Sequence, residues 1–452
     1  MKSIVQSALF LFFTFFSFFQ VLYSQPNPDI DKLDRYFTAL EQNNRFMGSV
    51  FIMYEDEILF NRAYGIMAAD GTPAVPESIY RIGSITKSYT DVMILKLVEQ
   101  GELTLDSTLD QFFPSIPNSN TITVEHLLRH QSGLVNFTNL PEYIEYYLEP
   151  RNREEHLAYF EKIGTSFEPG ANTEYSNTAY LLLGFIVEKL TRMDYEEALQ
   201  KMIVEPIGLQ STYFGDGIDT AGGEAESFFY REGEWHLSPE THMSVPHAAG
   251  AIISTAGETA AFYKALFNGE LLTDESFEKM VSFEGPFGLG MIRFPFHDNY
   301  ISGHNGGIDG YQSNSAHDPD NNLTFAILGN GVNYNFNDIL IGLLSIIYGM
   351  DFEFPDFKER QSIILTDEQL AAYSGTYTSP DFPLEIRLFA ENGNLMGQAT
   401  GQGAFPLTIY DEQTMAFEQA GIELLFEERE KERFQSFELR QSGMVYQFSL
   451  ED

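Results

Sequence analysis

The most constraining feature of the sequence is an apolar segment that begins shortly after Ser84 and ends at Gly101. Residues 88–100 are apolar almost without interruption from Val92 to Val98. An apolar run of this length that stops at a glycine is typical of an α-helix with a glycine cap at its C-terminus. Because the run is apolar on nearly all sides after its first turn, the helix is expected to be buried rather than to lie on a surface.

Two polar side chains, Ser84 and Lys87, are predicted at the start of this helix and on the same face. They stand three positions apart, and residues with that spacing are neighbours on a helix. A serine hydroxyl is a poor nucleophile at neutral pH unless a base or a cation lies beside it. A lysine in a dry site helps directly if it is neutral, or by lowering the pKa of another group if it is charged. A single Ser-x-x-Lys pattern also arises by chance in long chains, so its meaning depends on the rest of the sequence.

A second polar pair, Tyr175 and Asn177, is predicted on a loop just before another apolar helix at residues 180–190. The Pro169-Gly170 step upstream marks a turn. A tyrosine held near a lysine can lose its proton at a lower pH than a free phenol and act as a general base. The asparagine offers a donor and an acceptor that could fix the lysine and a substrate amide. Taken alone, Tyr175 could equally be an ordinary half-buried core tyrosine.

A third motif combines a histidine with glycines in the run Ser302-Gly303-His304-Asn305-Gly306-Gly307. An apolar strand end runs into these glycines, which permit close approach of the backbone to a ligand. A lone histidine in a glycine-rich loop is more often structural than catalytic, so this motif also gains meaning only from its company.

Several other segments predict the layers around these motifs. Residues 30–40 have apolar side chains at helical spacing, which predicts a helix, and residues 50–64 predict a hairpin around an acidic turn. Strand-like runs follow at 311–316 and 323–328, and residues 338–348 have the pattern of a closing helix.

Two segments contain residues of the kinds that bind metals, but the pattern of each favours another interpretation. Residues 123–133 predict a short helix that ends at Gly133, in which His126 and His130 lie four apart. The acidic residue of a His-Glu-x-x-His zinc motif is missing between them, which favours packing histidines. Residues 318–322 are rich in Asp and Asn, but their proline and the flanking apolar runs favour a hairpin turn over a calcium loop. We therefore expect no metal.

The charge of the chain limits its partners. It carries 66 acidic and 26 basic residues, for a net charge of -40. Such a surface repels nucleic acid and anionic membranes. Because the charge is spread along the chain, it indicates a solubility surface rather than an acidic binding tail. No glycine-rich lysine motif for phosphate is present in the sequence, and no cofactor is expected.

Residues 1–24 have the pattern of a signal peptide. A single early lysine precedes a Phe/Leu-rich core, and Leu22-Tyr23-Ser24 precedes Gln25. The alternative is an uncleaved membrane anchor, although polar residues interrupt the core and it is short for a membrane span. The sequence has no cysteine, hence no disulfide framework and no lipid attachment at the cleavage site. Export to a periplasm or the medium is expected, with no membrane contact after cleavage.

The texture of the sequence changes after Gly349. Residues 351–359 are rich in Pro, Phe and charge, as in a linker, and short alternating segments recur from residue 365 onward. Strands at that spacing predict a small antiparallel barrel. The predicted organisation is a signal peptide at 1–24, a main domain at 25–350, a linker at 351–362 and a barrel at 363–452.

Taken together, Ser-x-x-Lys, Tyr-x-Asn and His-x-Gly in this order resemble the serine β-lactamase and penicillin-binding-protein family. The closest likeness is to its class C-like branch, which includes D-alanyl-D-alanine carboxypeptidases, D-aminopeptidases and related esterases. The resemblance covers roughly residues 31–349. A conventional α/β-hydrolase is disfavoured because no Gly-x-Ser-x-Gly elbow occurs. Further runs that look like the family are His126-Leu127-Leu128, Ser132-Gly133-Leu134, Pro206-Ile207-Gly208-Leu209, Ala249-Gly250, Ser254-Thr255-Ala256 and Phe287-Gly288-Leu289-Gly290.

The resemblance implies an α+β fold: an antiparallel sheet between helices, with a helical subdomain, and the site between them. The C-terminal barrel resembles, more weakly, the lipocalin-like domains appended to some members. By the same resemblance, Ser84 is the acylated nucleophile, and Lys87 and Tyr175 form the general-base pair. Asn177 positions substrate and lysine, and His304 stands where many relatives carry lysine.

The resemblance also implies the groups that bind the substrate. Two backbone N–H groups, those of Ser84 and Gly307, would form the oxyanion hole, with Asn305 and Gly306 beside the substrate. The run His304-Asn305-Gly306 replaces the commoner Lys-Thr-Gly, which removes a cation and a hydroxyl that hold a substrate carboxylate in relatives. Glu174 could be mistaken for a deacylating glutamate, but its place beside Tyr175 favours the tyrosine-centred interpretation.

These features favour an exported serine hydrolase that forms an acyl-enzyme at Ser84. Its expected substrates are small D-amino-acid-containing peptides, amides or esters, peptidoglycan fragments among them. The alternatives are a true β-lactamase, which the altered third motif disfavours, and a non-catalytic protein that binds cell-wall fragments. The sequence leaves the oligomeric state open.

Overall fold

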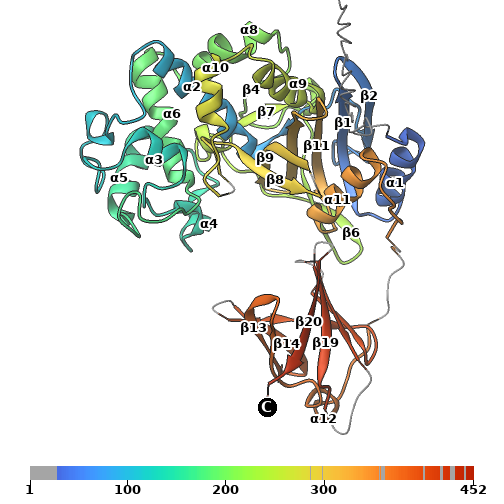
Figure 1. Cartoon of the computed structure of the whole chain (residues 1–452). Helices are drawn as coiled ribbons and strands as arrows, with labels where there is room; N and C mark the ends of the chain where they lie inside the picture. The colour runs from blue at the N-terminus through green and yellow to red at the C-terminus, as the bar shows by residue number, and fades with distance from the viewer. Residues whose placement is uncertain are drawn as a thin grey trace, which may run out of the picture.

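The chain folds into a larger mixed α/β part and a smaller C-terminal β-part (Figure 1). The predicted signal peptide lies outside the described residues. The computed structural model describes residues 28–285, 287–297, 299–355, 357, 362–400, 403–417, 421–427, 433–441 and 444–451.

A mainly antiparallel sheet forms the centre of the larger part. Its strands follow the order β2-β1-β11-β10-β9-β8, and β5 and β6 extend it beside β11. The register of β1 on β11 runs from Phe46 opposite Val332 to Tyr54 opposite Leu323, so the early hairpin pairs with a late strand. The strands are β1 (Phe46–Tyr54), β2 (Glu57–Tyr64), β5 (Phe228–Arg231), β6 (Glu234–Leu237), β8 (Ile292–Phe296), β9 (Asn299–Ile308), β10 (Tyr311–Asp318) and β11 (Leu323–Val332).

Helices cover both faces of this sheet because its side chains alternate between two hydrophobic cores. The helices of these cores are α1 (Ile30–Gln42), α2 (Thr86–Glu99), α6 (Asn177–Thr191), α9 (Ala256–Phe267) and α11 (Phe336–Ile347). The core shared with α1 and α11 receives Val50, Ile52, Phe325 and Ile327. The core shared with α2, α6 and α9 receives Phe51, Ala326 and Leu328.

Of the shorter helices, α3, α4 and α5 form the subdomain beside α6 (Figure 1). The helix predicted at residues 123–133 is shorter than expected, since α3 ends at Leu128. His130 and Gly133 both have positive φ values, +58° and +75°, and that backbone conformation cannot continue a right-handed helix. The short helices are α3 (Val124–Leu128), α4 (Tyr143–Tyr146), α5 (Arg153–Ile163), α7 (Tyr195–Leu199), α8 (Glu205–Ile207) and α10 (Asp274–Met280).

A small three-stranded sheet, in the order β3-β7-β4, lies directly before the Ser84 segment. Strand β3 (Tyr80–Arg81) pairs with β7 (Ile252–Ser254), which also pairs with β4 (Tyr213–Phe214). This sheet fixes the path of the chain into α2.

The C-terminal part is a nearly closed barrel, as the sequence predicted. Within its described residues, nine strands follow the order β15-β14-β13-β12-β20-β19-β18-β17-β16, and aromatic side chains such as Tyr377, Phe437 and Phe448 fill the interior. A short helix, α12 (Asp367–Leu370), precedes the strands. The strands are β12 (Gly375–Ser379), β13 (Phe382–Glu391), β14 (Asn394–Ala399), β15 (Phe405–Pro406), β16 (Thr408–Ile409), β17 (Thr414–Phe417), β18 (Ile422–Phe426), β19 (Ser436–Gln441) and β20 (Met444–Leu450).

The segment between the two parts packs partly on the larger one. The rings of Phe352 and Phe354 lie 5.2 and 5.4 Å from the ring of Tyr36 in α1, and Phe357 packs on the same core. Among the described residues, we find no helix long and apolar enough to cross a membrane.

These contacts predict where the larger part can be cut. A chain of residues 25–362 keeps the phenylalanines and should unfold cooperatively without the barrel. A chain of residues 25–349 loses all three phenylalanine rings and should be less stable by about 3 kcal/mol, since each partly buried ring contributes roughly half of full burial. Denaturant unfolding followed by circular dichroism measures the difference. Equal stability of the two chains, or failure of the longer one to fold, would contradict this division of the chain.

Candidate active site

Ser84 lies in a single 3-10 turn, η1 (Gly83–Ile85), between β3 and α2. Gly83 makes this turn possible. Its φ is +54°, and a Cβ on it would lie 2.8 Å from the backbone N of Gly307. Only glycine combines that backbone conformation with so close an approach. The turn therefore presses the Ser84 backbone against β9.

The Lys87 side chain is fully buried beneath Ser84. Its Nζ lies 3.1 Å from Ser84 Oγ, 2.8 Å from Asn177 Oδ1 and 2.7 Å from the Ala249 carbonyl oxygen. Burial holds the pKa of Lys87 well below its ordinary value. A neutral amine donates its two hydrogens to the amide and carbonyl oxygens, which only accept. Its lone pair is then left for the Ser84 hydroxyl, as a general base requires.

Asn177 is held in one orientation at the start of α6. Its Nδ2 donates to Thr138 Oγ1 at 3.0 Å, and its backbone N donates to Asn136 Oδ1 at 3.0 Å. Since Nδ2 is committed to the threonine, Oδ1 points to Lys87. Ser176 caps the helix by accepting from the N–H of Ala179.

Tyr175 contacts both members of the Ser84 and Lys87 pair. The Lys87 Nζ lies 4.8 Å from the centre of the Tyr175 ring. Burial raises the pKa of Tyr175 above its ordinary value, although a hydrogen bond with Ser84 opposes this. This shift runs opposite to the lowering expected from a neighbouring lysine, because burial of the phenol is the larger effect. In the free protein Tyr175 is a hydroxyl.

His130 supports Tyr175 from behind. The two rings lie 4.4 Å apart, and His130 Nδ1 accepts from the backbone N of Ser176 at 3.2 Å. His126 instead caps α3, since its Nδ1 accepts from the backbone N of Thr123 at 3.2 Å. The two histidines that could have suggested a metal are thus engaged in separate structural contacts.

His304 lies on β9 and forms the wall facing Tyr175, with the two ring centres 6.4 Å apart. Burial is the largest cause that lowers the pKa of His304, to about 3, so the ring is neutral at physiological pH. Its Nδ1 lies 2.5 Å from the Asn305 carbonyl oxygen. That carbonyl can only accept, which assigns the ring proton to Nδ1 and leaves Nε2 as an acceptor.

The glycines after His304 let β9 lie against the Ser84 turn. A Cβ on Gly306 would lie 2.1 Å from the Ile82 carbonyl oxygen and 3.0 Å from the Ser84 backbone N. Gly307 has open space on its Cβ side, with the nearest atom 3.9 Å away. The Asn305 side of the strand is exposed. This geometry brings the Ser84 and Gly307 backbones together, whereas Gly306 serves the close approach.

Sequence reasoning missed a buried carboxylate, Asp91, one helical turn beyond Lys87. Burial raises its pKa well above the ordinary value. Its Oδ2 accepts from the Tyr180 hydroxyl at 3.3 Å, and its Oδ1 has no hydrogen-bond partner among the described residues. An acidic residue inside an apolar helix, four positions after Lys87, is the signal that could have found it. The Ala249 carbonyl and Thr138 carry no comparable signal.

Comparisons with known proteins agree with this geometry. The family described as Beta-lactamase matches residues 33–343. Penicillin-binding protein 4* of Bacillus subtilis (strain 168) is 23% identical over 406 residues, which are 82% of this chain and 87% of that protein. Teichoic acid D-alanine hydrolase of Staphylococcus aureus (strain MRSA252) is 26% identical over 196 residues, which are 43% of this chain and 47% of that protein.

One solved structure covers both parts of the fold. The octameric penicillin-binding protein homologue from Pyrococcus abyssi aligns with a TM-score of 0.65 at 24% identity, over 93% of this chain and 99% of that one. With the family match over most of the larger part, the chain belongs to the beta-lactamase family. It is a serine hydrolase of the penicillin-binding-protein kind.

The lowered pKa of Lys87 predicts how Ser84 reactivity depends on pH. The ammonium form exists below the folded-state pKa and the amine form above it. Labelling of Ser84 by a fluorophosphonate should therefore rise with pH and level off well below the pH where an ordinary lysine titrates, about 10.4. His304 should add no inflection between pH 5 and 9, since its pKa is about 3. The labelling rate is measured by intact-protein mass.

Lys87→Arg is the matched control, because arginine stays charged throughout this range. Its labelling should be slow at every pH. A wild-type inflection near pH 10.4, or unchanged labelling of Lys87→Arg, would contradict a neutral Lys87.

Proposed function

We propose that the protein is an exported hydrolase that removes D-aminoacyl groups from amides or esters through an acyl-enzyme at Ser84. The observation that carries the proposal is the wall opposite Ser84, where a neutral histidine with an accepting Nε2 replaces a fixed cation. The proposal of export rests on the signal-peptide pattern of residues 1–24.

The wall favours substrates with an amino group over substrates with a carboxylate. His304 is neutral, and the Arg81 guanidinium three residues before Ser84 is bound to Asp309 and Glu240. An ammonium or N–H can donate to His304 Nε2, whereas a carboxylate finds only another acceptor. A D-aminoacyl group has the amino group, and teichoic acid D-alanine hydrolase is named for a D-alanine substrate.

In the proposed reaction, Ser84 Oγ attacks the acyl carbonyl while its proton passes to the Lys87 amine. The N–H groups of Ser84 and Gly307 stabilise the oxyanion, each contributing about 3 kcal/mol of barrier lowering. The Tyr175 hydroxyl hydrogen-bonds Ser84 and relays a proton to the leaving amine or alcohol. Water then attacks the Ser84 ester while the Lys87 and Tyr175 pair takes its proton. The bond to Ser84 Oγ breaks, the pair returns the proton to that oxygen, and the free amino acid leaves.

A direct test compares D- and L-alanine p-nitroanilide and the methyl esters of both. Wild type should hydrolyse the D-forms preferentially, and Ser84→Ala should lose at least about a thousandfold in kcat/KM because the covalent route is gone. Ser436→Ala in the barrel is the matched control and should be unaffected. Activity that survives Ser84→Ala would sink the proposal.

A second arm tests the wall. His304→Lys should raise acylation by penicillin, a carboxylate, relative to cleavage of D-alanine p-nitroanilide by roughly tenfold, or 1.4 kcal/mol. Rapid cephalosporin turnover by wild type would instead favour the β-lactamase alternative. Tight binding of peptidoglycan fragments with no turnover of any substrate would favour a binding protein.

A further inference from the structure

We infer that Arg81 and Asp309 form a buried ion pair that positions the two N–H groups of the oxyanion hole. Arg81 stands three residues before Ser84 and Asp309 two residues after Gly307. The two residues are positioning groups, since neither contacts the reacting atoms. The inference rests on the proposed function through the roles given to Ser84 and Gly307.

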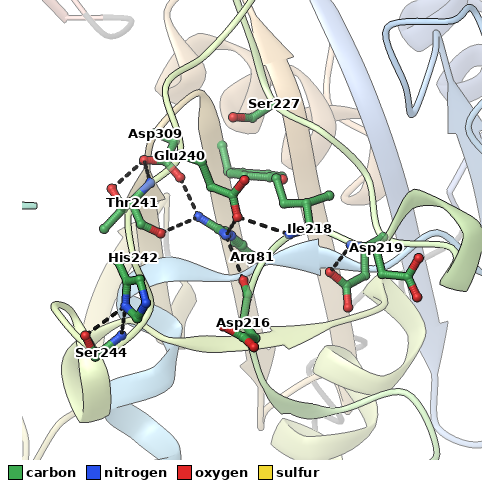
Figure 2. Close-up of polar contacts among 12 residues, drawn as sticks. Arg81, Asp216, Ile218, Asp219, Ser227, Glu240, Thr241, His242, Ser244 and Asp309 are labelled. Carbon is green, nitrogen blue, oxygen red and sulfur yellow. Dashed lines mark hydrogen bonds and ion pairs between the residues drawn. The ribbon is translucent and has the colours of Figure 1, made fainter. Parts of the chain in front are cut away.

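The Arg81 guanidinium joins three segments (Figure 2). Only 3% of its side chain is exposed. Its Nη1 donates to Asp309 Oδ2 at 2.8 Å and to the Thr241 carbonyl at 3.0 Å. Its Nη2 donates to the Asp216 carbonyl at 3.0 Å and to Glu240 Oε1 at 2.5 Å. The bonds to Asp309 and to the two backbone carbonyls fix the end of β3, and therefore the start of the Ser84 turn.

Asp309 holds the other side of the pair. It occupies the two-residue turn between β9 and β10 with a φ of +51°. The turn backbone is exposed, yet only 3% of the Asp309 side chain is. Its Oδ1 accepts from the Thr241 backbone N at 3.1 Å and from the Thr241 hydroxyl at 2.5 Å. Every carboxylate oxygen thus has a directed partner, as a buried charge requires.

A second connection lies between the ion pair and the proposed oxyanion hole. The Ser313 hydroxyl on β10 donates to the Ile82 carbonyl at 2.8 Å. Beyond it, Gly83 and Gly306 let the two backbones touch. The segments carrying the Ser84 and Gly307 N–H groups are therefore joined by contact at the glycines and by the ion pair next to them. Without the ion pair, the β9–β10 turn can shift relative to Ser84 while the strands remain paired.

The contacts of Arg81 identify one variant that should disturb the oxyanion hole and one that should not. Glu240 shares the same guanidinium but is 42% exposed, and it joins Arg81 to Ile218 rather than to the β9–β10 turn. Its loss leaves the Arg81 and Asp309 pair in place. Asp309→Asn keeps the size of the side chain and its tolerance of positive φ. It removes the charge and, in either orientation, turns its NH2 group toward a donor, either the Arg81 guanidinium or the Thr241 backbone N–H.

The test measures kinetics and the binding of phenylboronic acid, which forms a tetrahedral anion on Ser84 Oγ and so probes the oxyanion hole. Asp309→Asn should lower kcat for D-alanine p-nitroanilide at least tenfold, a fraction of the loss caused by removing one donor. KM should stay within about twofold, and the boronate affinity should fall in parallel with kcat. Glu240→Gln should keep both values near wild type.

If Asp309→Asn does not fold, Thr241→Val provides the measurement, because it keeps the ion pair and removes only the hydroxyl on Asp309 Oδ1. It should lower kcat and boronate affinity together, by less than tenfold. Wild-type kcat and boronate affinity in the folded variants, with or without a lower melting temperature, would overturn the inference. If wild type cleaves no D-aminoacyl substrate, the substrate proposal fails, yet boronate binding still tests the positioning role because it needs only Ser84 and the hole.

Discussion

The burial of the Lys87 amine is the constraint to which the rest of the larger part is fitted. An ammonium group cannot be enclosed without water unless strong partners compensate for it, and a lysine relieves that cost by losing its proton. Here the helices α2 and α6 and the 3-10 turn at His247–Ala249 close around it, and the two fixed acceptors are Asn177 Oδ1 and the Ala249 carbonyl. Burial of a lysine usually only destabilises a protein. Here it favours the neutral amine, which can accept the proton of Ser84.

The second requirement is that two distant stretches of chain meet at atomic contact. The Ser84 turn and the β9 strand touch through positions where any side chain larger than hydrogen would collide, as at Gly83 and Gly306. Glycines allow this approach but cannot hold it, since they contribute no side-chain contacts. Hydrogen bonds between neighbouring polar groups, above all those of Arg81, Asp309 and Ser313, keep the two segments together.

Much of the fold followed from periodicity and turn residues. The early hairpin, the late strands and the barrel were predictable because apolar and polar residues alternate locally in each of them. The helix after Ser84 was predictable because its sequence is apolar on nearly all sides. The short α3 was not, because the left-handed backbone of His130 is imposed by tertiary contacts with Ser176 and Tyr175.

In the site, too, some features were predictable from the sequence and others were not. The grouping of Ser84, Lys87 and Asn177 was readable from motif order, and the structure brings their polar atoms within hydrogen-bonding distance. The protonation states were not readable, because they depend on burial. Desolvation keeps Tyr175 protonated and His304 neutral, whereas the sequence alone suggested a tyrosine of lowered pKa. The Asp91 carboxyl group was likewise not predicted, since its burial depends on how the helices pack around it.

The most direct measurement of the central claim is the mass of the intact protein, followed over time after mixing with a penicillin or with a slowly hydrolysed D-aminoacyl ester. The account predicts an added mass equal to the acyl group, located by peptide mapping on Ser84 and missing from Ser84→Ala. An unmodified protein that still consumes the ester, or an adduct on any other residue, would contradict an acyl-enzyme at Ser84.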